Sequence, residues 1–196
     1  MTKVCLIDGS GYIFRSFYAL PNMTAPDGTP VNALCASYET NEESTEYVFH
    51  IREDANWMNG VPVTADDFVF AWRRLVDPVT AAEYSFMMEV AAVKNATPII
   101  SGELPIEELG VSAVDSKTLK VELDHPVSYI LNLMTFPSFC PINEAFATEL
   151  GSEYALGADK LLCCGPFYMS AWDVGGNTYQ LKKNPSYYDA DKVNLD

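Results

Sequence analysis

Residues 49–78 read FHIREDANWMNGVPVTADDFVFAWRRLVDP, and this run predicts a strand, a tight turn and a helix in succession. Apolar side chains alternate from Tyr47 to Ile51, which predicts a strand with one face toward the core. Asn59 and the glycine that follows it are typical of a tight turn. Asp77 is followed by proline and predicts the end of the helix, because proline disfavours helical backbone at the residue before it.

The helix within this run has a start signal and an apolar face. Thr64 is placed to cap its amino terminus, and Asp67 lies three residues on as a shorter-armed form of the capping-box acid. Phe68, Trp72 and Leu75 then recur at helical spacing. These three residues predict the side of the helix that faces the core.

A second helix is expected directly after residue 78. Thr80 and Glu83 give its start signal, and the residues that follow include Tyr84, Met87 and Met88. A stripe of methionine and aromatic side chains is typical of core packing, and it can also line a ligand pocket. The sequence leaves both interpretations open.

Further elements are expected along the rest of the chain. Residues 111–114 and 119–123 predict two strands that pair through the turn between them. Asn143 is placed to cap a helix that ends at Gly151. The alternation of Tyr179 and Leu181 predicts another strand.

Composition limits the classes of function. The chain has 196 residues, of which 48% are hydrophobic, so it can form a substantial core as one domain or two small ones. Its formal net charge is −15, and this charge repels nucleic acid and anionic membrane surfaces. A nucleic-acid partner is therefore disfavoured, and no stretch has the apolar length of a membrane-spanning helix.

The cysteines do not indicate a disulfide framework or a metal site. Their number is odd, and no C-x-x-C motif occurs. Only two histidines are present to assist zinc binding. The adjacent Cys163 and Cys164 could be redox-active, or they could pack as small apolar residues beside a strand. Packing is the first interpretation. The cysteines are Cys5, Cys35, Cys140, Cys163 and Cys164.

The 49–78 run resembles the pattern of the extracellular solute-binding proteins of family 5, the oligopeptide- and dipeptide-binding components of ABC importers. Two later stretches extend the resemblance, at residues 110–134 and 164–189. Cys164 stands where the family has a small hydroxyl or polar residue. The matching positions within the first run are Phe49, Arg52, Trp57, Asn59, Gly60, Pro62, Thr64, Ala65, Asp67, Arg74 and Pro78.

The resemblance implies a mixed α/β (α+β) fold, as part of one lobe of a type II periplasmic binding protein. It also implies a peptide ligand and an ABC permease as partners, with a periplasmic or cell-surface location for the parent family. Tyr84 resembles a family position that can approach the ligand, and it is the one ligand-binding residue expected. The resemblance implies no cofactor and no catalysis.

The first residues differ from the rest of the chain. Lys3 to Ile7 predicts a short buried strand, followed by a turn at Asp8 and a helix. Residues 1–34 resemble the amino-terminal start of the 5′-nuclease domain of bacterial DNA polymerase I. In that family the aspartate matching Asp8 is one of several metal-binding carboxylates. The others are not found here, so Asp8 is interpreted first as a turn and helix-cap residue.

The expected organisation is therefore a nuclease-like segment at residues 1–34, a polar linker at 35–46 and a partial solute-binding lobe at 47–196, with a strand-turn-helix appended at the amino terminus. The apolar run after Lys3 is too short for a secretory signal, so a cytoplasmic location is expected for the sequence as written. No nucleophile–base pair is found in the sequence, and catalytic residues are not expected. The alternatives to peptide binding are a nuclease fragment and a fusion without a function of its own.

Overall fold

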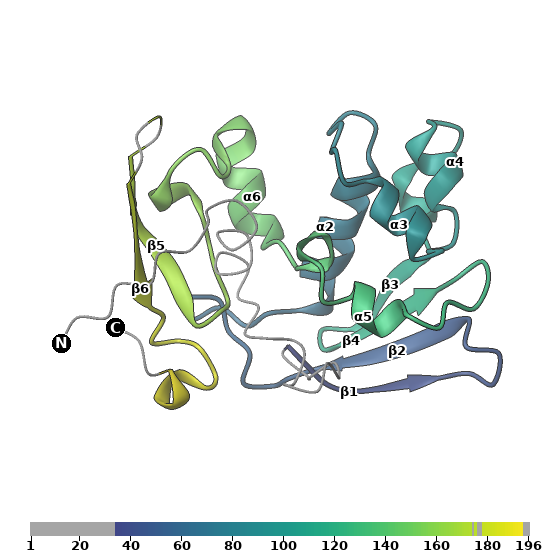
Figure 1. Ribbon diagram of the computed structural model, residues 1–196, viewed down its shortest axis with the longest axis horizontal. Helices are drawn as coiled ribbons and strands as arrows, with labels where there is room; N and C mark the ends of the chain where they lie inside the picture. Colours follow the sequence, from purple (N-terminus) through teal and green to yellow (C-terminus); the bar gives the residue numbers. More distant parts are fainter. Residues whose placement is uncertain (1–33, 174, 176–177, 194–196) are drawn as a thin grey trace.

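Four antiparallel strands form the main sheet of the computed structural model, which describes residues 34–173, 175 and 178–193 (Figure 1). The alternation predicted for the second strand is confirmed, because Tyr47, Phe49 and Ile51 are all buried. Tyr47 pairs with Val121 and Phe49 with Leu119, so the apolar face continues across the sheet. In sheet order the strands are β1 (Cys35–Thr40), β2 (Glu46–Ile51), β4 (Thr118–Glu122) and β3 (Val111–Asp115).

The expectation of a linker at residues 35–46 is wrong as to local structure, because these residues form β1 and the turn into β2. The turn is closed by Asn41, whose Oδ1 accepts hydrogen bonds from the Thr45 N–H at 2.9 Å and the Glu46 N–H at 3.0 Å. An edge strand can be polar, since both of its faces can meet solvent, and β1 is largely exposed. Composition alone therefore did not separate this strand from a loop. The predicted domain boundary after residue 34 stays a prediction.

Helices cover one face of the sheet, with α2 packed against β3 and β4 (Figure 1). The α-helices are α2 (Ala65–Val76), α3 (Phe86–Val90), α4 (Ala96–Ile100), α5 (Ile130–Leu133) and α6 (Glu144–Leu150). The 3-10 turns are η1 (Ile106–Glu108), η2 (Pro137–Phe139), η3 (Gly151–Glu153), η4 (Ala158–Lys160) and η5 (Ala190–Lys192).

The helix α2 confirms its predicted cap and its predicted central tryptophan. Trp72 is 1% exposed, and its indole N–H donates to the backbone oxygen of Phe139 at 3.1 Å. The two rings meet edge to face, with centroids 5.4 Å apart. The buried side of the helix is rotated from the predicted one: Val69 and Val76 accompany Trp72 in the core, and Phe68 and Leu75 are only partly buried.

The second predicted helix begins later than its signals indicated. The backbone after α2 turns at Asp77, whose Oδ1 accepts a hydrogen bond from the Val79 N–H at 2.9 Å. Ala81 then adopts a φ of 50°, in the left-handed region, and this conformation interrupts a helix. The helix α3 starts only at Phe86, without a side-chain cap. Thr80 therefore does not serve as an N-cap.

A separate two-stranded ribbon lies at one end of the molecule beside α6 (Figure 1). It consists of β5 (Phe167–Trp172) and β6 (Tyr179–Lys183). Directly after β6, the side-chain amide of the fully buried Asn184 donates to the backbone oxygen of Gly165 at 2.7 Å. The predicted hairpin of β3 and β4 and the predicted cap of α6 at Asn143 are both confirmed.

Candidate functional site

Three aromatic rings lie together on the surface and form the first candidate site, called here the aromatic patch: Tyr84, Phe86 and Phe136. The ring centroid of Tyr84 lies 5.9 Å from that of Phe86 and 5.7 Å from that of Phe136. The three residues are 51%, 45% and 36% exposed, respectively. Ring faces that are in contact yet open to solvent offer a ready surface for another apolar or planar group.

The local fold explains why these rings face outward. The turn before α3 is held by the Met87 N–H, which donates to the Tyr84 oxygen at 3.0 Å. Met87 and Met88, in the same helix, are 8% and 0% exposed and fill the core. Because the methionines occupy the inner side of this short helix, the aromatic side chains before and at its start lie on the outer side.

Phe136 reaches the patch from a distant part of the sequence. It lies between α5 and η2, where its N–H donates to the Leu133 oxygen at 2.8 Å and its own oxygen accepts from the Phe139 N–H at 3.0 Å. These two turns fix the backbone on both sides of the ring. The contact between Phe136 and Tyr84 therefore joins two segments that are separated by some fifty positions in the sequence.

The sequence located this patch only in part. Tyr84 was expected to approach a ligand, and the structure places it at the surface in the centre of the patch, which is compatible with that role without testing it. The core interpretation of Met87 and Met88 is confirmed by their burial. Phe86 and Phe136 were not identified, and the only signal for either residue was its aromatic side chain.

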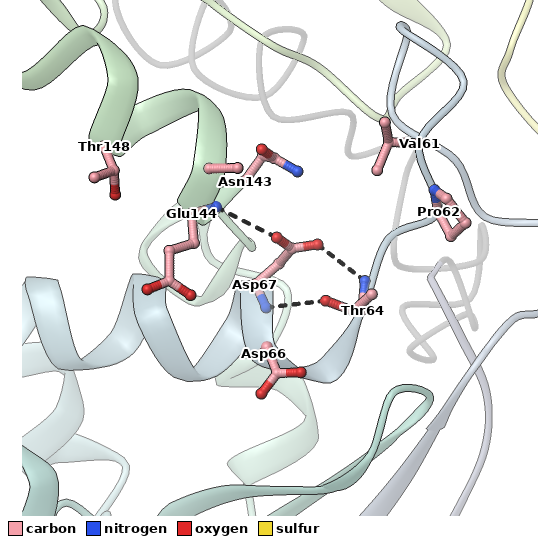
Figure 2. Close-up of a pocket in the computed structure, with 9 residues that line it drawn as sticks. Val61, Pro62, Thr64, Asp66, Asp67, Asn143, Glu144 and Thr148 are labelled. Atoms are coloured by element: carbon pink, nitrogen blue, oxygen red, sulfur yellow. Dashed lines mark hydrogen bonds between the residues drawn. The ribbon is translucent and has the colours of Figure 1, made fainter.

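A second candidate is an open groove of about 500 Å³ between the amino-terminal ends of α2 and α6 (Figure 2). The loop before α2 supplies one wall, and the first two turns of α6 supply the other. The lining residues are Val61, Pro62, Thr64, Asp66, Asp67, Asn143, Glu144, Ala145 and Thr148.

A buried carboxylate fixes the shape of this groove. Asp67 is 5% exposed, and its Oδ2 accepts hydrogen bonds from the Trp57 indole N–H at 3.0 Å and the Thr64 N–H at 2.9 Å. Its other oxygen accepts from the Glu144 N–H at 3.4 Å, as Figure 2 shows. Asp67 thus joins the loop, α2 and α6. The sequence predicted the cap but not the longer-range bonds.

The chemistry of the groove makes it a weaker candidate than the aromatic patch. Its lining contains no basic and no aromatic residue, and Asp66 and Glu144 leave it acidic. Capping side chains already accept from an N–H group in the first turn of each helix: Thr64 Oγ1 from the Asp67 N–H at 3.4 Å in α2, and Asn143 Oδ1 from the Phe146 N–H at 2.9 Å in α6. The groove therefore presents few free donors to a peptide backbone.

The cysteines of the described region favour packing over redox chemistry. Cys140, Cys163 and Cys164 are all buried. Burial raises the pKa of Cys140 to about 12 and that of Cys163 to about 11, and it also raises the pKa of Cys164. A thiol held neutral in this way is a poor nucleophile at neutral pH.

The described residues contain no group of three or more histidine, cysteine, aspartate or glutamate side chains arranged to hold a metal ion. Asp8, the carboxylate that resembles a nuclease metal ligand, lies outside the described residues. Within the described part of the chain, no helix is both long and apolar enough to cross a membrane.

Comparison with known proteins gives one consistent result. Residues 29–196 match the family described as bacterial extracellular solute-binding proteins, family 5 Middle. The oligopeptide-binding protein OppA of Bacillus subtilis is 36% identical over 185 residues, which are 94% of this chain and 33% of that protein.

Two solved structures show the likeness of fold. Peptide-bound OppA of Listeria monocytogenes is 45% identical with a TM-score of 0.83, and the match covers 91% of this chain and 34% of that one. OppA of Haemophilus influenzae in complex with RPPGFSPFR is 33% identical with a TM-score of 0.84, over 91% of this chain and 35% of that one. This chain thus spans about a third of the length of the relatives that it matches.

Proposed function

The chain belongs to the bacterial extracellular solute-binding proteins of family 5, and we propose that it supplies part of the ligand-contacting lobe of a peptide-binding component of an ABC importer. Its mixed α/β fold is that of a partial type II periplasmic-binding-protein lobe. The relatives named above are oligopeptide-binding proteins, and their names support a peptide as the ligand class.

The observation that carries the proposal is the aromatic patch. Rings that are in contact and about half exposed provide apolar area against which a peptide side chain can pack. Tyr84 is at the centre of this patch and is the residue proposed to contact the ligand first. The polar groups that bind a peptide backbone by strand addition are proposed to come from main-chain atoms, because that mode needs few side chains.

The proposed role is binding without catalysis, and the family supports it. Solute-binding proteins present a ligand to a permease, so an ABC permease is the proposed second partner, with an extracellular setting as in the family description. The raised thiol pKa values of the buried cysteines are consistent with a structural role for these residues. No cofactor is part of the proposal.

The leading residues 1–34 keep their nuclease-like interpretation only as a prediction, together with the proposal that the chain is a fusion. The family match begins at residue 29, so most of this segment lies outside it, whereas the match to OppA of Bacillus subtilis covers 94% of the chain and therefore includes most of the segment. A test is cleavage of flapped DNA in the presence of Mg²⁺ or Mn²⁺, compared between the wild type and Asp8→Asn. Metal-dependent cleavage that is lost in the variant would favour the nuclease alternative.

The affinity of this chain alone is expected to be weak. Peptide-binding sites enclose the ligand, and a single partial lobe removes water from only one side of it. Association also costs several kcal/mol of rigid-body freedom, which a small contact does not offset. We therefore expect dissociation constants no tighter than about millimolar.

A titration followed by NMR tests the proposal at this affinity. A ¹⁵N-labelled sample is titrated with a mixed tri- to pentapeptide library to a concentration of several millimolar, and shifts are expected at Tyr84, Phe86 and Phe136. Tyr84→Ala is expected to abolish these shifts. Tyr179→Ala, which removes a 44% exposed tyrosine on β6, is the matched control and is expected to keep them. An absence of peptide-induced shifts in the wild type would contradict the proposal.

A further inference from the structure

We infer that the aromatic patch selects peptides with a cationic side chain, lysine or arginine, at the position that contacts Tyr84. The inference rests on the proposed function and adds a ligand class to it. It is carried by the geometry of the rings and by the charges of the two segments that supply them.

The rings are arranged so that a cation can reach a ring face. The plane of Tyr84 is inclined by 30° to that of Phe86 and by 46° to that of Phe136, so neither pair is stacked face to face. Because 51% of Tyr84 is exposed, a charged group from solvent can approach its side chain. Ammonium and guanidinium groups bind such faces through the ring quadrupole.

The two segments that build the patch carry acidic residues and no lysine or arginine. Residues 75–93 supply Tyr84 and Phe86 and include Glu83, which is exposed and adjacent to Tyr84. Residues 121–159 supply Phe136. A region of this composition attracts a cationic ligand and repels an acidic one over distances up to the Debye length, about 8 Å at physiological ionic strength.

The basic residues at the borders of these segments are engaged elsewhere. Lys94 pairs with Glu122 at 3.8 Å, Lys120 pairs with Glu46 at 2.8 Å, and Lys160 pairs with Glu153. The guanidinium of Arg74 lies 5.9 Å from the ring centroid of Tyr154, and Arg73 donates to the Glu107 oxygen at 3.0 Å. These basic side chains of the chain itself therefore do not bind to the aromatic patch. A cationic side chain of a ligand can bind to the rings without competing with them.

Three peptides with identical blocked termini test the inference: Ala-Lys-Ala, Ala-norleucine-Ala and Ala-Glu-Ala. Norleucine keeps the apolar stem of lysine and removes its charge. By NMR titration of the full chain, the lysine peptide is expected to bind about 3-fold more tightly than the norleucine peptide, a ratio typical of an exposed cation–π contact. The ratio should decrease in 1 M NaCl, and the glutamate peptide should bind most weakly.

Variants separate the ring from the charge. Tyr84→Leu keeps an apolar side chain without a ring and is expected to bring the lysine-to-norleucine ratio close to 1, whereas Tyr179→Leu on β6 should leave it unchanged. Glu83→Gln changes an exposed side chain with little effect on folding, and it should weaken the lysine peptide alone.

The possible failures are distinct. Equal affinity for the lysine and norleucine peptides would overturn the inference and leave the proposed function standing. Tighter binding of norleucine would identify an apolar specificity and also overturn it. If none of the three peptides shifts any resonance, both the inference and the proposed function fail.

Discussion

Removal of the Asp67 carboxylate should destabilise the lobe far more than removal of the neighbouring carboxylate of Asp66. In Asp67→Ala, the buried indole N–H of Trp57 and the partly buried backbone N–H of Thr64 lose acceptors at 3.0 and 2.9 Å. Hydrogen bonds to a charged group contribute about 1.5–3 kcal/mol each. Part of the loss is offset because the buried charge no longer has to be desolvated.

The expected net cost of Asp67→Ala is therefore about 3 kcal/mol in the free energy of unfolding, a large share of the roughly 5–15 kcal/mol typical of a domain. Asp66→Ala is the matched control, since Asp66 lies in the same helical turn and is exposed. It should cost about 0.3–1 kcal/mol through the lost interaction with the helix dipole.

Urea unfolding followed by far-ultraviolet circular dichroism measures both variants against the wild type. A double-mutant cycle with Trp57→Phe, which removes only the indole donor and some ring area, measures the Asp67–Trp57 bond itself. We expect a coupling of about 1–2 kcal/mol, within the range for directly bonded residues. If Asp67→Ala and Asp66→Ala differ by less than about 1 kcal/mol, the buried network does not hold the loop, α2 and α6 together as described.

Three further predictions follow from the core. Trp72→Ala removes a buried ring and should cost about 3–5 kcal/mol in chemical unfolding, and a loss below about 1 kcal/mol would show that the ring is not in the core. Gly110→Ala should cost about 1–3 kcal/mol, because the new Cβ would lie 2.6 Å from Lys94 Cβ and 2.7 Å from the Glu122 backbone oxygen, and an unchanged melting temperature would contradict this. Burial raises the pKa of Cys163 from 9.0 to about 11. The buried neutral thiol therefore makes its full contribution to the free energy of unfolding below pH 9, and this contribution is lost as the pH rises toward 11. Unfolding measured from pH 8 to pH 11 should therefore show a smaller loss in Cys163→Ala, on the order of 2 kcal/mol less, and equal losses in the two proteins would refute it.

The sequence correctly predicted the helices and strands whose signals come from neighbouring residues in a regular pattern. The β2 alternation, the α2 cap at Thr64 and the β3–β4 hairpin all depend on side chains within a few positions of one another, and the structure confirms them. The edge strand β1 was missed because its side chains are polar. It forms by hydrogen bonding to the backbone edge of β2, and composition does not show that such an edge is available. The start of α3 was misplaced because Ala81 takes a left-handed conformation that nothing in its side chain favours.

The candidate site was predictable to the extent of one residue. Tyr84 was identified by resemblance to a family position, but its contacts with Phe86 and Phe136 depend on the packing of α3 beside the segment after α5. Similarly, the capping role of Asp67 follows from its spacing to Thr64, whereas its bond to Trp57 joins residues ten positions apart through the turn between them. Contacts of this kind arise from tertiary structure, which single-sequence patterns do not specify.

The position of a bound peptide tests the central claim most directly, because the claim assigns the ligand to the aromatic patch and not to the groove between α2 and α6. A peptide that carries a nitroxide spin label broadens the amide resonances of residues close to it, and this effect detects weak complexes at millimolar concentrations. We predict that broadening is strongest at Tyr84, Phe86 and Phe136. Broadening centred on Asp66, Glu144 and Thr148, in the groove, would contradict the account.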